Sequence, residues 1–491
     1  MKRIDSCPTM VSGCHGSALR PVRRHWSPSR PVAPESTRGF VLLAVLVVTV
    51  MAAMVAVGLL YRMQAERSAG AAMLQGEQAY AAAMSGIHTA LAVLTTPRSG
   101  PPEPVAEGET QPIFIADQSE WHDNPQVFRH RFVAFDGANR WYFTVYAPND
   151  TELEKIRYGL SDESGKLVIN AATAEQLDKL GLTPQQRDAL LDYKDTDSEL
   201  RENGAEQEYY DQLEPPYAIN HPFGTVEELL LVKGFSGRQV YGEDSNFSGL
   251  LEPNEDDGLP IFPPDDNDGK LARGLIDVFT LDTYKQGPTP DLDPLGLPKR
   301  MFNQATPEQL EEIGLDPSTI DTIQQLKQAN ANAGPLDLLK NPAFNVPTDQ
   351  LHLVMSYLSD RGFNPVGLIN LNTAPATVLA TLPGIEPGLA ADIVASRADL
   401  SPDERTSTVW LLSRGLLDVE QFIAVAPQLK TSGYQFRVRC VGYGVPSGRY
   451  RVLEAVIDAR PMDQAKVRVL SLRDITRLGA PFPLDAESES E

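Results

Sequence analysis

The chain has 491 residues, long enough for more than one compact domain, and its 66 acidic and 43 basic residues give a net charge of −23. Such an acidic chain disfavours nucleic acid as a partner, because phosphates need cationic side chains. Of its cysteines, Cys7 and Cys14 lie near the N-terminus and form no recognisable zinc site, while Cys440 stands alone. No spacing of residues indicates a nucleophile with its base. Composition therefore argues against an enzyme.

Residues 40–61 form an apolar segment with no charged side chain. At about 1.5 Å per residue, a helix of this length spans the hydrocarbon layer of roughly 30 Å. The preceding residues 1–39 carry seven basic and two acidic residues, which leaves −28 on the remainder. Because basic flanks stay in the cytoplasm, we expect a single-pass protein with a cytoplasmic N-terminus and an exported C-terminal part. A plain signal anchor is the alternative, whereas a secretory signal peptide would be shorter.

A helical pattern continues after the apolar segment. Met84, Ile87, Leu91 and Leu94 follow one another at steps of three and four residues, which is typical of a helix with one apolar face. We therefore predict one helix over residues 40–96, with its first half in lipid and its second half carrying a folded head.

Gly39 lies directly before this long apolar helix. In this arrangement the chain resembles the type IV pilin and pseudopilin class. The resemblance implies that prepilin peptidase cleaves between Gly39 and Phe40 and that the new N-terminus is methylated. The fifth mature residue of most members is a glutamate that pairs with a neighbouring subunit, and here it is Ala44. Because a carboxylate in lipid needs a partner, its absence favours a subunit at the tip of a fibre.

Alternating apolar residues predict strands over 128–146, 434–443 and 450–457, and helical patterns fill much of 173–240 and 305–400. Clusters of turn-forming residues predict a surface linker over 97–112. The acidic segment 241–270 is rich in proline and glycine and reads as an exposed loop, and the tail 476–491 reads as disordered.

An internal repeat occurs three times, each copy with an asparagine, a leucine seven residues later and a glycine eleven or twelve residues later: Asn170, Leu177 and Gly181; Asn303, Leu310 and Gly314; Asn372, Leu379 and Gly384. The pattern is typical of helix-hairpin-helix units, which often bind DNA phosphates through backbone amides. Here Glu386 and Pro387 follow the third glycine, and a carboxylate repels phosphate. A structural role is favoured, and a membrane-anchored helix-hairpin-helix protein that binds or takes up DNA is the alternative.

Residues 192–206 are rich in side chains whose oxygen atoms can bind a hard cation. Counted from Asp195, the chain places Asp197, Glu199 and Glu206 at positions three, five and twelve of a calcium-binding loop. Position six is Leu200 where such loops have glycine, so a regular EF-hand backbone is not expected. A solvated acidic turn is the alternative. Asp192 is a further candidate ligand.

Several motifs resemble the type II secretion minor pseudopilin K family, also called general secretion pathway protein K. They are the acidic run that ends in Gly204-Ala205-Glu206, the pair Tyr209-Tyr210, Glu214-Pro215-Pro216-Tyr217, the segment from Glu228 to Gly234, and Asn372-Thr373-Ala374. The resemblance implies calcium in the helical domain, which makes Asp195, Asp197, Glu199 and Glu206 the candidate ligands.

The same resemblance implies an α+β fold with a long N-terminal transmembrane helix and a pilin-like antiparallel sheet domain interrupted by an inserted α-helical domain. The implied division is a leader, a helix, the first part of the pilin-like domain, the inserted domain, the second part with the third repeat, and a tail: 1–39, 40–96, 97–169, 170–362, 363–475 and 476–491. The implied function is to cap and initiate the periplasmic pseudopilus at the inner membrane. The implied partners are other minor and major pseudopilins, inner-membrane secretion components and the prepilin peptidase.

Overall fold

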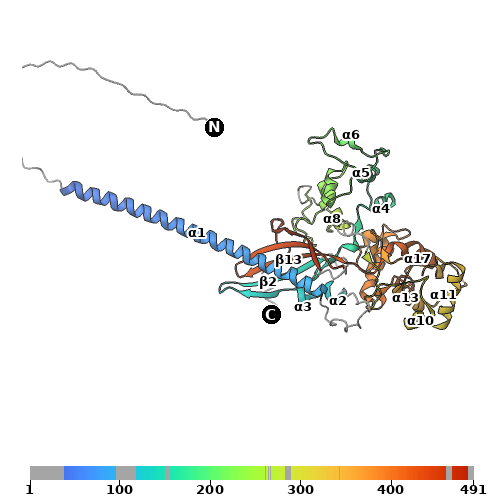
Figure 1. The fold of residues 1–491 in the computed structure, drawn as a ribbon. Coiled ribbons are helices and arrows are strands. Elements are labelled where there is room, and N and C mark those ends of the chain that lie inside the picture. The colour runs from blue at the N-terminus through green and yellow to red at the C-terminus, as the bar shows by residue number, and fades with distance from the viewer. Residues whose placement is uncertain are drawn as a thin grey trace, which may run out of the picture. The chain divides into compact units, whose positions relative to one another are not determined.

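The structure is a computed structural model that describes residues 38–95, 118–149, 155–259, 261, 263, 265, 267–281, 289–341, 343–460 and 467–484 (Figure 1). Nearly all of the predicted leader and the whole of the predicted linker 97–112 lie outside these residues. The chain divides into two compact units, Met1–Gly70 and Ala71–Glu491, which are described separately.

The first unit contains the start of helix α1, which runs over Arg38–Thr95 and confirms the single long helix predicted from the sequence. Its apolar side chains from Phe40 to Leu60 are exposed. Phe40–Thr95 contains a window of mean hydropathy 3.0 with none of it buried, so length and composition allow this helix to cross a membrane.

In the second unit, the end of α1 packs against an antiparallel sheet. Its buried face includes Ala79, Ala83, Ile87, Ala90 and Leu94, at the spacing of one helix face. The strands follow the order β1-β2-β13-β14-β15, with β3 paired to β2 and β4 paired to β13. Their bounds are β1 Arg131–Phe135, β2 Arg140–Pro148, β3 Ile156–Arg157, β4 Ser161–Asp162, β13 Gln435–Val445, β14 Arg449–Asp458 and β15 Arg468–Asp474. The three predicted strand regions are confirmed, the first as a pair of strands.

Small residues allow α1 to approach the sheet closely. A side chain at Gly442 of β13 would collide with the backbone of Ala79 and Ala83 of α1, and one at Gly86 of α1 would collide with Cys440. The helix therefore lies directly on the centre of the sheet. Ile87, Phe143, Val438 and Cys440 share the core between them.

Residues 163–434 separate the two groups of strands and contain most of the helices that follow α1 (Figure 1). The two short helices before β1 are α2 Gln118–Trp121 and α3 Pro125–Phe128. Those after β4 are α4 Ala174–Lys179, α5 Pro184–Lys194, α6 Gln207–Tyr210, α7 Gly237–Tyr241, α8 Leu275–Val278, α10 Pro307–Glu312, α11 Pro317–Ala329, α12 Asp337–Lys340, α13 Thr348–Tyr357, α14 Ala376–Leu379, α15 Pro387–Ser396, α16 Trp410–Ser413 and α17 Val419–Val425. Pairs of two-residue strands join them: β5 Leu167–Val168 with β6 Phe279–Thr280, β7 Thr289–Pro290 with β10 Phe363–Asn364, β8 Arg300–Met301 with β9 Leu358–Ser359, and β11 Ile369–Asn370 with β12 Leu429–Lys430.

Each predicted repeat forms two helices around a glycine with a positive φ angle, the conformation that glycine adopts without strain. The φ angles are 77° at Gly181, 89° at Gly314 and 71° at Gly384. Two further hairpins have the same geometry at Gly234 and Gly415. The sequence analysis missed them because they lack the asparagine that opens the other three.

The three repeats belong to two separate hydrophobic cores. The first and third share one core, in which Leu177 and Leu190 join Leu379 and Ile393. The second has a separate core around Phe302, Leu310, Ile323 and Val354. This grouping does not follow the boundary expected after residue 362, and the limits of an inserted domain remain a prediction.

Two predicted exposed segments are partly buried. In the acidic segment 241–270, the side chains of Glu243, Asp244 and Glu255 are buried, because backbone amides donate hydrogen bonds to their carboxylates. In the predicted tail, Phe482 packs edge-on against Tyr146. The tail is therefore ordered as far as residue 484, where the described residues end.

A buried ionic network joins the sheet to the helical region. Glu454 of β14 contacts Arg437 and Arg439 of β13 at 3.0 Å each. Arg437 also lies 2.7 Å from Glu163, which follows β4. Arg473 of β15 pairs with Glu454 at 2.6 Å and with Glu227 of the helical region at 3.0 Å. Strands and helices thus share buried charges.

Candidate metal centre

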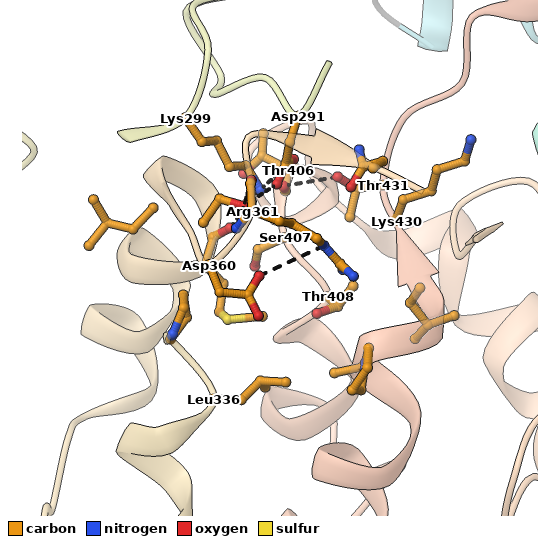
Figure 2. Close-up of a pocket in the computed structure, with 18 of the residues that line it drawn as sticks. Asp291, Lys299, Leu336, Asp360, Arg361, Thr406, Ser407, Thr408, Lys430 and Thr431 are labelled. Carbon is orange, nitrogen blue, oxygen red and sulfur yellow. Dashed lines mark hydrogen bonds and ion pairs between the residues drawn. The ribbon is translucent and has the colours of Figure 1, made fainter. Parts of the chain in front are cut away.

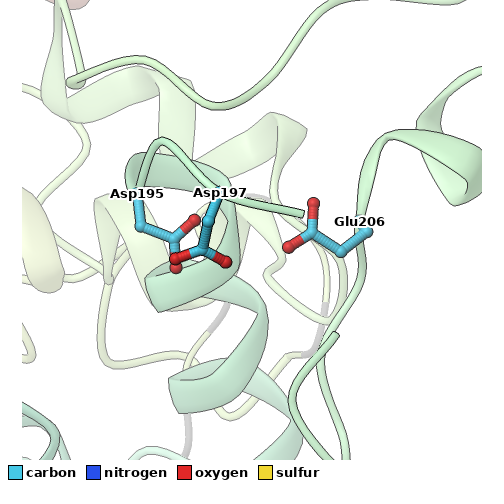
Figure 3. Close-up of side chains that lie close together, drawn as sticks. All are labelled: Asp195, Asp197 and Glu206. Carbon is cyan, nitrogen blue, oxygen red and sulfur yellow. The ribbon is translucent and has the colours of Figure 1, made fainter. Parts of the chain in front are cut away.

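Three of the predicted ligands converge beside the end of α5. Asp195 caps the C-terminus of this helix, Asp197 follows two residues later, and Glu206 caps the N-terminus of α6. One carboxylate oxygen from each lies within 4.8 Å of the other two (Figure 3). Two helix ends therefore bring together acids that are eleven residues apart in the chain.

Three carboxylate oxygens of this cluster are buried without a hydrogen-bond partner. Both side-chain oxygens of Glu206 and Oδ1 of Asp195 are buried and accept no hydrogen bond. Burial, followed by the negative charges of Asp192 and Asp195, raises the pKa of Glu206. A buried carboxylate without a partner is costly, and a bound cation would remove that cost.

One positive side chain already lies in the cluster. Arg201 forms ion pairs with Asp195 at 2.7 Å and with the fully buried Asp192 at 2.5 Å. Asp192 also accepts a backbone hydrogen bond from Ala205 at 3.0 Å. Asp192 therefore has a structural role in closing the loop, and Asp195 keeps one oxygen free.

The structure does not bring Glu199 into the cluster. Its side chain is exposed, and its backbone N–H donates to Asp197 at 2.8 Å. Position six of the proposed loop is Leu200, which is also exposed. Without a glycine there, the chain does not turn position five back toward the other ligands as it does in an EF-hand.

Asn220 is an additional oxygen donor that the sequence analysis missed. Its side-chain nitrogen donates to the carbonyl of Asp197 at 2.6 Å, and its Oδ1 atom is buried without a partner. Its φ angle of 64° is unusual for a residue other than glycine. Asn220 lies beyond the acidic run, so spacing within that run gave no signal for it.

The donor set suits a hard divalent cation. Three carboxylates and an amide oxygen are the ligands that Ca²⁺ prefers, whereas thiolates or imidazoles would indicate zinc. The residues present therefore fit the calcium ion that the sequence analysis expected, with Asn220 in place of Glu199.

A second polar site is a cavity of about 100 Å³ between α13 and β12 (Figure 2). Its charged lining pairs internally, with Lys299 at 3.2 Å from Asp291 and Arg361 at 3.8 Å from Asp360. Because these charges are nearly balanced, the cavity indicates no particular class of ligand.

The hairpins offer little to a phosphate. The side-chain hydroxyl of Thr183 accepts a hydrogen bond from the backbone N–H of Gln186 at the start of α5. The carboxylate of Asp316 accepts a hydrogen bond from a backbone N–H at the start of α11, and that of Asp418 accepts one at the start of α17. One amide at each of these helix starts is therefore already satisfied, at two of them by an acid. Helix α15 of the third repeat has no side-chain cap, but the residue at its N-cap position is the acid Glu386.

Together, a long apolar helix and an antiparallel sheet packed on its C-terminal half define an α+β protein whose N-terminal helix is long and apolar enough to cross a membrane. Residues 163–241, which include the candidate metal centre, match the family model described as type II secretion system (T2SS), protein K. This match confirms the resemblance found in the sequence for the part of the chain that the family model covers.

The other comparisons add less. No curated protein matches the chain. Among solved structures, the chain is similar to one in the crystal structure of the GspK-GspI-GspJ complex from the enterotoxigenic Escherichia coli type 2 secretion system. The identity is 13%, the alignment covers 84% of this chain and 99% of that chain, and the TM-score is 0.29.

Proposed function

We propose that this protein is a minor pseudopilin of a type II secretion system that caps the tip of the periplasmic pseudopilus and initiates its assembly. The observation that carries the proposal is the protein K family match over residues 163–241, in a chain that also has the apolar helix α1. The role is structural and includes no catalysis.

Helix α1 anchors the protein in the membrane and assembles it with other pseudopilins. After cleavage between Gly39 and Phe40, its apolar part stays in the inner membrane with the head in the periplasm. There it packs laterally against the corresponding helices of other minor and major pseudopilins. Prepilin peptidase and inner-membrane secretion components are the further partners.

Two features favour the tip over the body of the fibre. Ala44 replaces the carboxylate that would need a neighbouring subunit's N-terminus. The helical region of residues 163–434 adds bulk to the sheet, and such a head fits poorly between subunits of a helical fibre. A subunit with both features can begin a fibre but is poorly suited to its interior.

Calcium belongs to the proposal as a stabiliser of the head. Asp195, Asp197, Glu206 and Asn220 would hold it, between the end of α5 and the start of α6. The ion would supply positive charge to carboxylates that are otherwise buried without partners.

The functional test is complementation in the native host. A strain lacking this chain should retain type II substrates in the periplasm, and the intact gene should restore their release. Normal secretion without the chain would overturn the proposal. Gold-labelled antibody against the head should mark fibre ends, and labelling along fibres would overturn the tip position.

The calcium test is thermal unfolding of the full chain in detergent. Chelator should lower the melting temperature of the wild type, and calcium should restore it, since a ligand that binds only the folded state stabilises it. Asp197→Asn should remove most of this shift, and the exposed Asp321→Asn in α11 is the matched control. An identical response of wild type and Asp197→Asn would remove this cation site.

The second candidate is a membrane-anchored DNA-binding or uptake protein, which the helix-hairpin-helix units favour. A gel shift with duplex DNA that weakens with salt would support it. The acids at the starts of α11, α15 and α17 and the net charge of −23 predict no shift.

A further inference from the structure

A cavity of about 450 Å³ opens between α13 and the segment from Asp403 to Ser413, which contains α16. It lies where two hydrophobic cores meet. Leu353 of α13 packs against the core of the second repeat, whereas Val409 and Trp410 belong to the core that the first and third repeats share. Two segments that are far apart in the chain therefore form its walls.

The deep part of this cavity is apolar. Val409 and Trp410 are each 1% exposed, and Leu353 beside them is half-buried. Ligand pockets in proteins typically combine such apolar walls with a few polar groups that orient the ligand. The walls suit an alkyl chain, which would bury its surface against them.

The rim of the cavity carries negative charge. Asp349, Asp403 and Glu404 line it, and among the described residues of the lining none is a lysine or an arginine. Glu404 is already paired with Arg414 at 2.8 Å, outside the lining. The other two acids are exposed at the mouth, and the side chain of Asp403 is 84% exposed. The rim therefore offers two carboxylates to a cation.

The contacts that these two acids make leave their charge available. Asp403 lies 3.6 Å from Nε2 of His352, whose Nδ1 is bound to the hydroxyl of Ser407 at 2.8 Å. Asp349 contacts the side-chain amide of Gln350 at 3.5 Å. In the part of the chain that the structure describes, neither acid forms an ion pair with a lysine or an arginine. A positively charged ligand would complement both.

A polar group in the wall of the cavity has no partner. Trp410 lines the cavity, and the N–H of its indole ring is buried without a hydrogen-bond acceptor. A buried donor that makes no hydrogen bond is costly, so an occupant that brings an acceptor is favoured. Lysine and arginine side chains carry only donors. The acceptor would therefore be a main-chain carbonyl of the segment that carries the cation.

We propose that this cavity binds a lysine or arginine side chain in an extended segment of a partner protein. The alkyl part of that side chain would lie on Leu353 and Val409, with its charge at the rim near Asp349 and Asp403. Long basic side chains bury their alkyl part in this way while the charged group stays near water. The pocket is separate from the candidate metal centre, and the proposal does not depend on the proposed function.

The test is peptide binding to the full chain in detergent, followed by fluorine NMR after incorporation of 5-fluorotryptophan. The chain has four tryptophans, so comparison with tryptophan-to-phenylalanine variants identifies the Trp410 signal. The probe is a five-residue alanine peptide with a central lysine and blocked ends. It should shift the Trp410 signal to saturation, and the same peptide with a central glutamine should bind at least about threefold more weakly. Equal binding of the two peptides, or no shift with either, would overturn the proposal.

Variants at the rim locate the interaction and are expected to fold, because the two acids are exposed. Asp349→Asn and Asp403→Asn should each weaken the lysine peptide by about two- to fivefold, and Asp403→Glu should retain its affinity. Asp392→Asn is the matched control, since Asp392 is an exposed acid of α15 that does not line the cavity. Unchanged affinity when Asp349→Asn and Asp403→Asn are combined would refute the site.

A free amine distinguishes a peptide site from a site for small cations. Butylamine carries the alkyl chain and charge of lysine without a carbonyl group. It should bind more weakly than the lysine peptide, because it offers the indole N–H no acceptor. Butylamine that binds as tightly as the lysine peptide would contradict a protein segment as the occupant.

Discussion

The guanidinium of Arg201 lies 2.7 Å from a carboxylate oxygen of Asp195, one of the three clustered acids beside α5. The same guanidinium pairs with Asp192, which is fully buried. Arg201 therefore supports the loop through Asp192 and competes with a cation through Asp195.

Replacing this arginine should separate the two effects. Arg201→Gln should raise calcium affinity by about three- to tenfold, because a nearby positive charge repels the ion. It should also lower the melting temperature in chelator, since Asp192 loses its ion pair. Calorimetric titration and thermal unfolding measure the two quantities. Arg300→Gln is the control, because Arg300 pairs with Glu312 in another hairpin. Weaker calcium binding by Arg201→Gln would mean that Arg201 positions Asp195 for the ion.

Regular periodicity made the main elements predictable. The apolar run and the stripe from Met84 to Leu94 predicted α1, and alternation predicted β13 and β14. The recurring asparagine, leucine and glycine predicted three hairpins, because a positive φ angle strongly favours glycine. By contrast, β15 was missed, since nearly all of its residues are exposed and leave no alternating pattern.

The candidate sites show where sequence spacing is insufficient. Spacing identified Asp195, Asp197 and Glu206, but it also selected Glu199, whose side chain turns to solvent. Asn220 reaches the cluster through a distant loop that local spacing does not reveal. The acids of residues 241–270 looked solvated because composition does not record which backbone amides will bind them.

The ionic network around Glu454 should make the fold sensitive to acid. Burial raises the pKa of Glu454, but Arg437, Arg439 and Arg473 outweigh burial and hold its pKa well below the ordinary 4.5. A depressed pKa in the folded state stabilises the protein above the unfolded value, and this contribution is lost as the pH falls below it. Unfolding of the wild type should therefore become easier below about pH 4.5.

Removing this carboxylate tests the argument. Glu454→Gln should lower the unfolding free energy at pH 7 by about 3 kcal/mol or more, because three arginines lose a buried partner. It should also flatten the dependence of the melting temperature on pH between 7 and 3. Circular dichroism of the full chain in detergent measures both. The exposed Glu420→Gln in α17 should behave as the wild type, and an equal slope in Glu454→Gln would contradict the assignment.

Processing should depend on Gly39. Gly39→Val should leave the protein with its 39-residue leader, because the resemblance to pseudopilins places the cleaved bond directly after this glycine. N-terminal sequencing of protein purified from the host distinguishes a start at Phe40 from an intact leader. Gly58→Ala is the control, since Gly58 lies in the same helix with open space around it. Cleavage of Gly39→Val at the same bond would exclude this role for Gly39.

The contact between α1 and β13 should tolerate no added methyl group. At Gly442 a methyl would meet the backbone of Ala79 and Ala83, and backbone atoms of a packed helix move only together. Gly442→Ala should therefore lower the unfolding free energy by about 1–3 kcal/mol. The control is Gly388→Ala in α15, where nothing lies within 4 Å and alanine favours the helix. Thermal unfolding should show a lower melting temperature for the first variant and an equal or higher one for the second. Equal melting temperatures in both would mean that α1 does not rest on the sheet at Gly442.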